Sequence, residues 1–340
     1  MKTNLLTYAC LACLLAVGVS CRKSAAAAVT PVDSTPALLD PATLKGAMVF
    51  QSNFEHPCRI VPFGTVNDRI TGVDASLTGL QDWDALETTV LGSRPYFNYN
   101  GGDSLRRSAR LSSDPVAPGN RVLRYRISDH WPDVSSGSVK ARVQYEFYNI
   151  RSGFREYYQS VRLFLPEDFN LLRKYPNTID WLTLVEIWNN ITWSQSVPYG
   201  YRLTLGIGKP LPTEADLCFI VEGQDCLLRA DGSQQYTTIW SDRALKVKVP
   251  VGRWFTMDYY FKEGDARNGR FYMTIQPDGG RAEKVFDITQ FTHNTKDPSP
   301  DGVTHFNPMK LYTSSALVDY MKGLGKPLEI YWDEFRLWRR

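Results

Sequence analysis

The chain of 340 residues contains 43% hydrophobic and 22% charged residues, which supports a packed core and excludes a wholly disordered protein. Its 39 basic and 36 acidic residues leave a net charge of +3, too balanced for a protein that binds nucleic acid through its charge. The four histidines are isolated in sequence, and GxxxxGKS/T, GxGxxG and GxSxG motifs are absent. Zinc peptidases of the HExxH kind are therefore excluded, and nucleotide-binding proteins and serine hydrolases lose their usual support.

The N-terminus has the features of an export signal. Lys2 precedes a mostly apolar run over residues 5–19, which is too short for a membrane-spanning helix. The small residues before Cys21 resemble the lipobox of bacterial lipoproteins of the Bacteroides type, in which this cysteine is acylated and becomes the new N-terminus. We therefore expect a signal peptide over residues 1–20 and lipid on Cys21. The alternative is an ordinary secretory peptide cut near Ser20.

A flexible tether is expected to follow, over residues 21–42. It contains the run Ala25–Ala28 and three prolines. The residues directly after Cys21 are Arg22, Lys23 and Ser24, which are not acidic. In the lipoproteins that this segment resembles, surface export uses an acidic tag. We therefore expect an outer-membrane lipoprotein that faces the periplasm, with the cell surface as the alternative.

The cysteines of the mature chain predict one disulfide. Cys218 and Cys226 flank a segment that we interpret as two short strands around a turn, which would bring the two sulfur atoms together. The compartment outside the cytoplasm is oxidising, so the bond would persist. Cys58 would then stay unpaired and buried.

Short segments of alternating apolar and polar residues follow one another along the mature chain, a pattern typical of antiparallel strands. Turn signals such as Asn268-Gly269 separate them. Short helical turns are expected at residues 167–170 and 315–322. The predicted strands are 47–55, 121–127, 139–148, 157–165, 181–188, 201–207, 217–221, 254–261, 270–275, 284–288 and 328–338.

These strands predict an all-β fold, a two-sheet antiparallel β-sandwich of the jelly-roll kind. No βαβ rhythm and no internal repeat is present, which argues against parallel sheets and propellers. We expect one domain over residues 43–340 and a monomer. Residues 65–118 are less regular and are interpreted as long loops that decorate the sandwich.

Four parts of the chain resemble the concanavalin A-like jelly-roll superfamily, and within it bacterial polysaccharide lyases of the alginate-lyase and heparin-lyase kind. They are Val49–Glu55, Tyr157–Phe169, Gly252–Met257 with Asn268–Phe271, and Leu328–Trp338. The resemblance implies that the first and last of these strands pair and that the substrate binds in a groove on the concave sheet. Lectins and glycosidases share this frame, so the resemblance speaks for the fold more than for an activity.

One polar strand face carries the first candidate site residues. Arg142, Gln144 and Glu146 alternate with apolar residues and therefore point to one face of their strand. The related lyases have an Arg-x-Glu motif at this point, so the resemblance implies that Arg142 and Gln144 orient the substrate. The planar guanidinium of arginine suits a carboxylate or sulfate group. The alternative is a solvated sheet face without a function.

A second strand carries Glu186, Trp188 and Asn190, where the related lyases have Gln-x-His. The histidine is replaced by tryptophan, which departs from the family pattern. Trp188 offers a flat surface on which a sugar ring can stack, and Asn190 extends the polar edge. Glu146 and Glu186 form the best pair of carboxylates for acid, base or nucleophile roles in a glycosidase. The alternative for Trp188 is a place in the core.

A third segment carries Lys310 and Tyr312, where the related lyases have a lysine and a tyrosine at a different spacing. The resemblance implies that Tyr312 donates a proton to the leaving oxygen and that Lys310 lies in the substrate site and lowers the pKa of Tyr312. A tyrosine on the flank of a strand without a catalytic role is the alternative.

Many relatives in this superfamily hold a structural calcium ion near the first and last strands. In this chain Asn53, Glu55 and Asp333 would supply oxygen ligands. Ordinary polarity at a sheet edge is the alternative, because calcium needs six or more oxygen atoms in one place. No other cofactor is expected.

The sequence thus predicts an exported lipoprotein that binds a polysaccharide or oligosaccharide and cleaves it, as a polysaccharide lyase or a glycoside hydrolase. The alternative is a glycan-binding lipoprotein without catalysis, which the missing Gln-x-His motif favours. The membrane would be contacted through lipid on Cys21.

Overall fold

The computed structural model describes residues 38–86, 92, 95–99, 105–133, 138–150, 153–189 and 199–340. The signal peptide, Cys21 and Asn190 lie outside the described residues. Leu38–Arg340 forms one compact unit, which begins before the predicted boundary at residue 43. Within the described part of the chain, no helix has the length and apolar character needed to cross a membrane.

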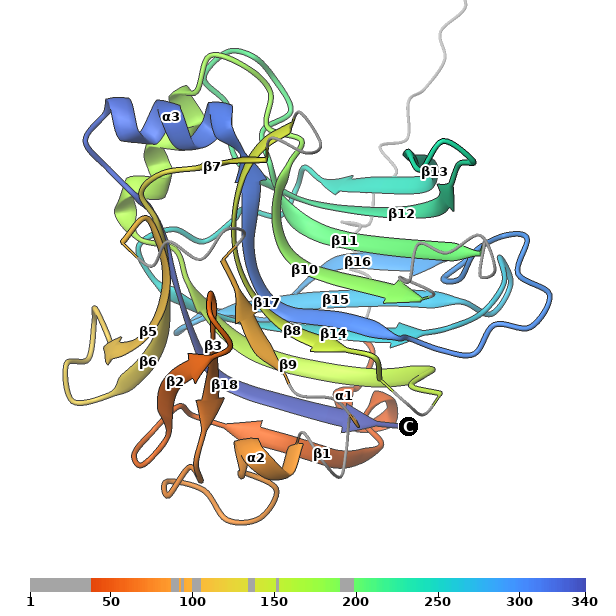
Figure 1. The fold of residues 1–340 in the computed structure, drawn as a ribbon, viewed down its shortest axis with the longest axis horizontal. Helices are drawn as coiled ribbons and strands as arrows, with labels where there is room; N and C mark the ends of the chain where they lie inside the picture. Colours follow the sequence, from red (N-terminus) through yellow and green to blue (C-terminus); the bar gives the residue numbers. More distant parts are fainter. Residues whose placement is uncertain are drawn as a thin grey trace, which may run out of the picture. The chain divides into compact units, whose positions relative to one another are not determined.

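Two antiparallel sheets build this unit (Figure 1). Sheet A has eight strands, and the second half of its long strand β18 pairs with β1, while the first half pairs with β6. Its strands in spatial order are β16 (Glu283–Thr289), β15 (Arg270–Pro277), β14 (Trp254–Lys262), β9 (Glu156–Phe164), β18 (Leu328–Arg339), β6 (Arg121–Ile127) and β5 (Arg107–Ser113), with β1 (Ala47–Ser52) beside β18.

Sheet B has ten strands, and β7 (Trp131–Asp133) pairs with β8 outside the main order. The main order is β13 (Gln234–Ala244), β12 (Cys218–Leu228), β11 (Gly200–Gly208), β10 (Leu182–Asn189), β17 (His305–Ser314), β8 (Ser138–Tyr148), β4 (Tyr96–Asn98), β3 (Asn67–Thr71) and β2 (Arg59–Phe63). The helical segments are short: α1 (Pro41–Leu44), α2 (Trp83–Ala85), η2 (Glu167–Lys174) and α3 (Ser315–Gly323).

The predicted all-β, two-sheet antiparallel sandwich is confirmed. The pairing of the first and last strands that the resemblance implied is also confirmed, because β1 and β18 run antiparallel from Ala47↔Arg339 to Ser52↔Phe335. Residues 65–118 are more regular than predicted, since β3, β4, α2 and β5 all lie there. Strand β13 was missed, because Gln, Tyr, Thr, Ser and Asp dominate it and no buried face marks it in the sequence.

Aromatic side chains fill much of the space between the sheets. Trp83 stacks on Phe335 and meets the edge of Tyr145, with ring centroids 6.3 and 5.4 Å apart. Phe97 packs on Tyr145 at 4.7 Å. Large rings bury much apolar surface, and paired rings add stability beyond that area. The sandwich is therefore a stiff support for the polar face of sheet B.

The predicted disulfide between Cys218 and Cys226 is wrong. Both cysteines lie in the single continuous strand β12, and Cys218, Cys226 and Cys58 are buried free thiols. A strand rises about 3.3 Å per residue, so eight positions place the two residues roughly 26 Å apart. Strand β12 pairs along its length with both β11 and β13, and these ladders leave no room for the turn that the prediction required.

The segment Leu38–Lys45, which contains α1, packs against an aromatic cluster on sheet A. Leu39 donates its backbone N–H to the Tyr272 hydroxyl at 3.0 Å. Leu44 is buried with Tyr158, Tyr260, Tyr272 and Trp338. The ammonium group of Lys45 lies 4.5 Å from the centre of the Trp338 ring. The last residues of the predicted tether, from Leu38 on, thus pack over the aromatic cluster of sheet A.

Deleting residues 1–45 is expected to lower the free energy of unfolding by roughly 3 kcal/mol, because Leu44 and the rings that it covers lose their burial. Urea denaturation followed by tryptophan fluorescence measures this loss. Deleting residues 1–37 alone should leave stability unchanged. Equal stability of the two truncations would show that the cover segment contributes nothing.

Candidate functional site

A groove lies on the polar face of sheet B. Two adjoining cavities, of about 390 and 260 Å³, share Lys140, Glu186, Arg202, Gln234, Tyr236 and Tyr312 in their walls. The smaller cavity is also lined by residues of β8, β10 and β17, namely Arg142, Gln144, Glu146, Trp188, His305 and Asn307. We refer to the two cavities together as the groove.

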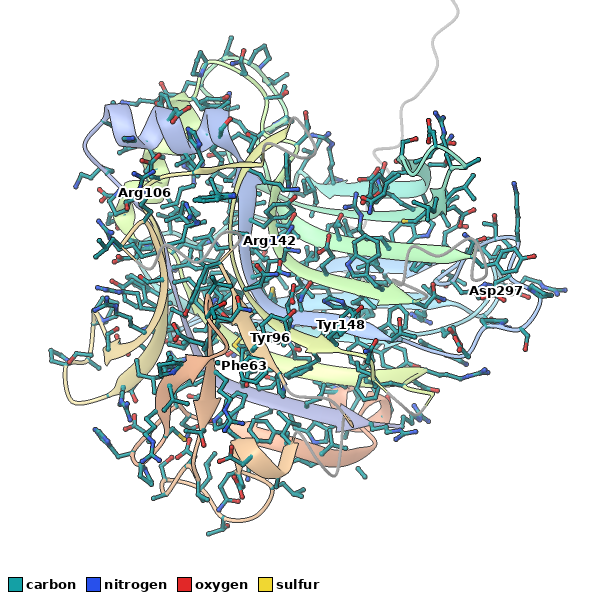
Figure 2. All side chains as sticks on the ribbon, viewed as in Figure 1. Phe63, Tyr96, Arg106, Arg142, Tyr148 and Asp297 are labelled. Atoms are coloured by element: carbon teal, nitrogen blue, oxygen red, sulfur yellow. The ribbon has the colours of Figure 1, made fainter. Side chains whose placement is uncertain are left out.

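Strand β8 supplies one wall through its alternating pattern. Val143 and Tyr145 are fully buried toward the core, whereas Arg142, Gln144 and Glu146 line the groove, as the sequence predicted. Gln144 donates its side-chain N–H to Glu146, and Asn98 donates to the same carboxylate at 3.3 Å. Figure 2 labels Arg142 on this strand.

A bulge in β17 sets which of its side chains enter the groove. The four residues Phe306–Met309 lie opposite only three residues, Tyr145–Phe147, on β8. A bulge of this kind changes which face later residues point to. Groove-facing positions on β17 are therefore His305, Asn307, Lys310 and Tyr312, with Phe306, Met309 and Leu311 buried toward the core.

Glu186 and Lys310 form a buried ion pair in the floor of the groove. Their exposed fractions are 4% and 1%, and the Lys310 ammonium contacts the Glu186 carboxylate directly. Arg202 adds a second positive charge 3.5 Å from the other carboxylate oxygen. Burial alone would raise the pKa of Glu186, but Lys310 and Arg202 outweigh it and hold the pKa well below its usual range. Glu186 is therefore ionised at neutral pH.

Lys310 takes a different place from the one predicted. It is not among the residues that line either cavity, and its ammonium points to Glu186 beneath the groove surface. Burial lowers its pKa, and the charge of Glu186 opposes that shift. In this arrangement, Lys310 holds the Glu186 carboxylate in the floor of the groove. A direct contact between Lys310 and the substrate stays a prediction.

Tyr312 lies between two cationic side chains. The Arg142 guanidinium and the Lys310 ammonium each lie 4.7 Å from the centre of its ring. Trp181 meets the ring edge-on at 4.8 Å. Burial raises the pKa of Tyr312, while the charge of Arg142 acts in the opposite direction, so the resting group is a neutral phenol. The predicted lowering of this pKa by Lys310 is therefore wrong, but Arg142 and Tyr312 do lie together in the groove.

Trp188 lines the groove but presents little surface to it, since only 6% of the residue is exposed. Arg202 lies over its ring at 5.3 Å and over the Tyr236 ring at 4.1 Å. Tyr236 is 38% exposed and is the more open aromatic surface of the two. Tyr236 was not predicted because β13 was not predicted, and Arg202 was not predicted because nothing in the pattern of its strand distinguishes it.

His305 was also missed as a site residue. It lies across from Trp188 and Tyr148 in the sheet, with its Nε2 atom 3.1 Å from the Asn307 amide and 4.0 Å from Glu146. The residue is buried, and its Nδ1 atom has no hydrogen-bond partner among the described residues. Burial lowers the pKa of His305 to about 4, against the opposing charge of Glu146, so the ring is neutral at pH 7.

The buried His305 makes stability depend on pH. An unfolded histidine titrates near pH 6.5, so below that pH the unfolded chain binds a proton that the folded protein does not. The free energy of unfolding should fall by up to about 3 kcal/mol as the pH drops from about 6.5 to about 4. His305→Gln removes this loss, and His56→Gln, at an exposed site, keeps it. Urea denaturation across this range gives the comparison, and parallel profiles for His305→Gln and the wild type would contradict the prediction.

The three residues predicted to bind calcium differ in whether their side-chain oxygens already accept hydrogen bonds. The Asn53 side-chain oxygen is buried without a hydrogen-bond partner among the described residues. Burial raises the pKa of Asp333 to about 7, and Asn120 donates a hydrogen bond to its carboxyl group at 2.9 Å. Glu55 accepts a hydrogen bond from the backbone of Arg121 at 2.8 Å. The Glu334 backbone donates to the second Asp333 oxygen at 2.7 Å, so both oxygens of this carboxylate and one oxygen of Glu55 are already engaged. Calcium binding by these residues stays a prediction.

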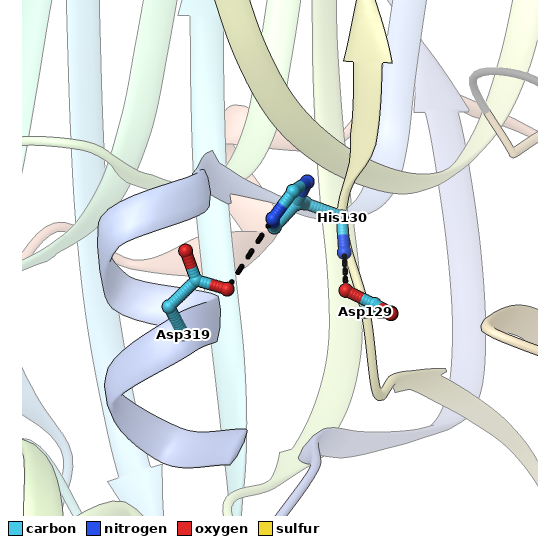
Figure 3. Close-up of side chains that lie close together, drawn as sticks. All are labelled: Asp129, His130 and Asp319. Carbon is cyan, nitrogen blue, oxygen red and sulfur yellow. Dashed lines mark hydrogen bonds and ion pairs between the residues drawn. The ribbon is translucent and has the colours of Figure 1, made fainter. Parts of the chain in front are cut away.

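A separate cluster links α3 to the loop between β6 and β7 (Figure 3). Asp129, His130 and Asp319 bring one ligand atom each within 4.8 Å of one another. His130 lies 3.3 Å from Asp319, and Asp129 pairs with Lys322 at 3.0 Å. Lys322 thus neutralises Asp129, and a network of ion pairs explains why these side chains lie together. None of these residues lines the groove.

No family model and no curated protein matches the chain. Among solved structures, it is similar to an endo-β-1,4-glucuronan lyase from the fungus Trichoderma reesei, with 14% identity, 75% of this chain and 93% of that chain covered, and a TM-score of 0.42. It is also similar to alginate lyase Aly36B, with 13% identity, 85% of this chain and 96% of that chain covered, and a TM-score of 0.43. For the catalytic domain of a glycoside hydrolase family 131 protein from Coprinopsis cinerea, the identity is 10%, 87% of this chain and 95% of that chain are covered, and the TM-score is 0.36. At these TM-scores we infer function from the groove itself.

Proposed function

We propose that the protein binds an acidic polysaccharide in the groove and cleaves it by β-elimination. The observation that carries this proposal is the contact between Arg142 and Tyr312 in a groove that is also lined by Lys140 and Arg202. Basic side chains attract a uronate chain. A hydroxyl beside a guanidinium supplies the two functions that elimination needs, a partner for the carboxylate and a group that moves a proton.

Arg142 would bind the carboxylate of the uronate. Arg142 lines the groove, and its buried Nε atom has no hydrogen-bond partner in the described structure, which favours a hydrogen-bond acceptor such as a carboxylate beside it. Neutralising the carboxylate makes the proton on the adjacent carbon easier to remove, because negative charge develops there in the transition state. Arg142 would thus neutralise the negative charge of the substrate carboxylate.

Tyr312 would move the proton. Its phenolate, stabilised by Arg142, takes the proton from the carbon beside the carboxylate. The electron pair of that bond forms the new double bond as the glycosidic carbon–oxygen bond breaks. The phenol then returns the proton to the leaving oxygen, so the tyrosine is regenerated.

Hydrolysis by Glu146 and Glu186 fits the groove less well than elimination does. A hydrolase needs one protonated carboxyl as its acid. Lys310 and Arg202 hold Glu186 in the ionised form. Glu186 could serve only as a nucleophile or base, and Glu146 would then have to be the acid while it accepts hydrogen bonds from Gln144 and Asn98.

One assay separates the possible outcomes. The protein is incubated with a panel of polysaccharides while new reducing ends and the ultraviolet absorbance of unsaturated uronate are followed. Both signals together support elimination. Reducing ends without absorbance would overturn it in favour of hydrolysis by Glu146 and Glu186. Retention on an immobilised glycan with neither signal would make this a glycan-binding protein without catalysis.

We also propose that the protein is an exported outer-membrane lipoprotein carrying lipid on Cys21. The small residues before this cysteine support the proposal. Metabolic labelling with a radioactive fatty acid should label the wild type and leave Cys21→Ala unlabelled. Equal labelling of both would exclude this site of acylation.

We further propose a structural calcium ion held by Asn53 and Asp333, with Glu55 as a third ligand. The unpartnered Asn53 oxygen supports it. Millimolar calcium should raise the melting temperature of chelator-treated protein, and magnesium should not, because magnesium prefers a tighter octahedral site. Asn53→Ala should lose the calcium response. No response in the wild type would exclude the site.

A further inference from the structure

The two ends of the groove differ in chemistry. At the cationic end, Lys140 and Arg142 lie two positions apart on β8, and Tyr312 pairs with Arg142 in the neighbouring strand. At the acceptor end, Glu146 lies beside His305 and Asn307. We use these two names for these two sets of residues.

Hydrogen-bond acceptors dominate the acceptor end. The Glu146 carboxylate is 4% exposed, and the Asn307 side chain is fully buried. The Asn307 oxygen and the oxygen of the adjacent Gln144 amide have no hydrogen-bond partner among the described residues, although both residues line the groove. Buried polar atoms left unpaired are costly, so they indicate a ligand that donates hydrogen bonds.

The acceptor end also repels negative charge. Glu146 contributes its carboxylate, and the neighbouring His305 ring is neutral because burial lowers its pKa to about 4. The charge of Lys310 is taken up by Glu186. A uronate carboxylate placed here would face a like charge. Sugar hydroxyl or acetamido N–H groups, in contrast, would satisfy the free oxygen atoms.

One sugar ring is too small to lie over the backbone positions of both ends. Arg142 and Glu146 are four positions apart on β8, which corresponds to about 13 Å along the strand. The two ends therefore contact different sugar residues of one chain. A polymer with a carboxylate on every residue meets repulsion at the acceptor end, while a chain with neutral residues between the acidic ones does not.

We propose that the groove selects an acidic polysaccharide in which uronate residues alternate with neutral sugars, in preference to a polymer of uronate alone. The uronate lies at the cationic end and the neutral sugar at the acceptor end. This inference rests on the proposed function for the location of the substrate, but it concerns binding and requires no bond cleavage.

The test compares oligosaccharides of equal length by calorimetry with the full-length wild type in the cold, where turnover is slow. The probes are hyaluronan and unsulfated chondroitin fragments, which alternate uronate and N-acetylhexosamine, and oligoglucuronate and oligomannuronate, which do not. A neutral cello-oligosaccharide is the control. Alternating probes should bind about tenfold tighter, a difference of about 1.4 kcal/mol. Equal or tighter binding of the homopolymers would overturn the inference.

Variants test the cause of the preference. Glu146→Gln removes the negative charge and should bring the affinity for the homopolymers to within about threefold of that for the alternating probes. Glu263→Gln is the matched control, because Glu263 is a buried carboxylate that pairs with Arg155 outside the groove and should keep the full preference. An unchanged preference in folded Glu146→Gln would contradict the role of Glu146. The wild-type ranking decides the main claim if that variant fails to fold.

The outcomes also separate this inference from the proposed activity. Selective binding of alternating probes without cleavage would refute elimination and leave the selectivity standing. Cleavage of homopolymers at the higher rate, with tighter binding, would support elimination and refute the selectivity. If neither class of acidic probe binds, both fail.

Discussion

Replacing Lys310 with methionine is expected to lower the free energy of unfolding by about 3 to 5 kcal/mol. Lys310 and Glu186 are both buried and contact each other directly. Without the lysine, Glu186 keeps the charges of Arg202, at 3.5 Å, and of Arg142, and it stays almost fully buried. Removing one partner of a buried ion pair is costly because the other charge stays desolvated. Urea denaturation of the full-length protein measures the loss.

Two further variants show whether the loss comes from the orphaned charge. Lys326→Met removes an exposed lysine paired with Asp168 at 3.0 Å and should change stability by less than about 1 kcal/mol. Combining Lys310→Met with Glu186→Leu should recover most of the lost stability, because an apolar pair can replace a buried ion pair. A double variant no more stable than Lys310→Met would mean that packing, and not charge, determines the cost.

Replacing Tyr312 with phenylalanine is expected to reduce kcat on an acidic polysaccharide by about 10²- to 10⁴-fold, because the variant has no hydroxyl to carry the proton. The ring would still pack on Trp181 and under Arg142, so the melting temperature should stay close to that of the wild type. KM should change little, since the carboxylate partner Arg142 remains. Absorbance of unsaturated uronate gives the rates.

The pH dependence provides a second readout for Tyr312. Burial raises the pKa of Tyr312, so its phenolate is scarce at neutral pH and the wild-type kcat should rise as the pH increases above 7. Tyr260→Phe is the matched control: it removes a hydroxyl that bonds to Glu156 at 2.6 Å outside the groove, and it should keep both the rate and the pH profile. Full activity of Tyr312→Phe would remove Tyr312 from the mechanism.

The sequence predicted one wall of the groove because β8 alternates without interruption. Its apolar residues, such as Val143 and Tyr145, face the core. Arg142 and Glu146 must then share the other face. The same local logic located most strands and the all-β class, since the period of two requires no knowledge of the partner strand.

Predictions that depended on how strands meet were less secure. The interval between Cys218 and Cys226 was interpreted as a hairpin, yet β11 and β13 pair with it as one continuous strand. Strand β13, with the exposed Tyr236, carries no buried stripe, so its place in sheet B depends on the ladder that β12 offers. Sequence patterns report the environment of a side chain, and an edge strand in solvent leaves only a weak pattern.

The sequence by itself determined most of the strands, their buried faces and the residue types available for binding acidic sugars. Only the tertiary structure decided which of them meet. The bulge in β17 turns Lys310 and Tyr312 to the face that already holds His305 and Asn307, although simple alternation would separate these pairs. A bulge is fixed by register with neighbouring strands, and that register depends on contacts between residues far apart in the chain. The buried Glu186–Lys310 pair, formed across two strands, has the same origin.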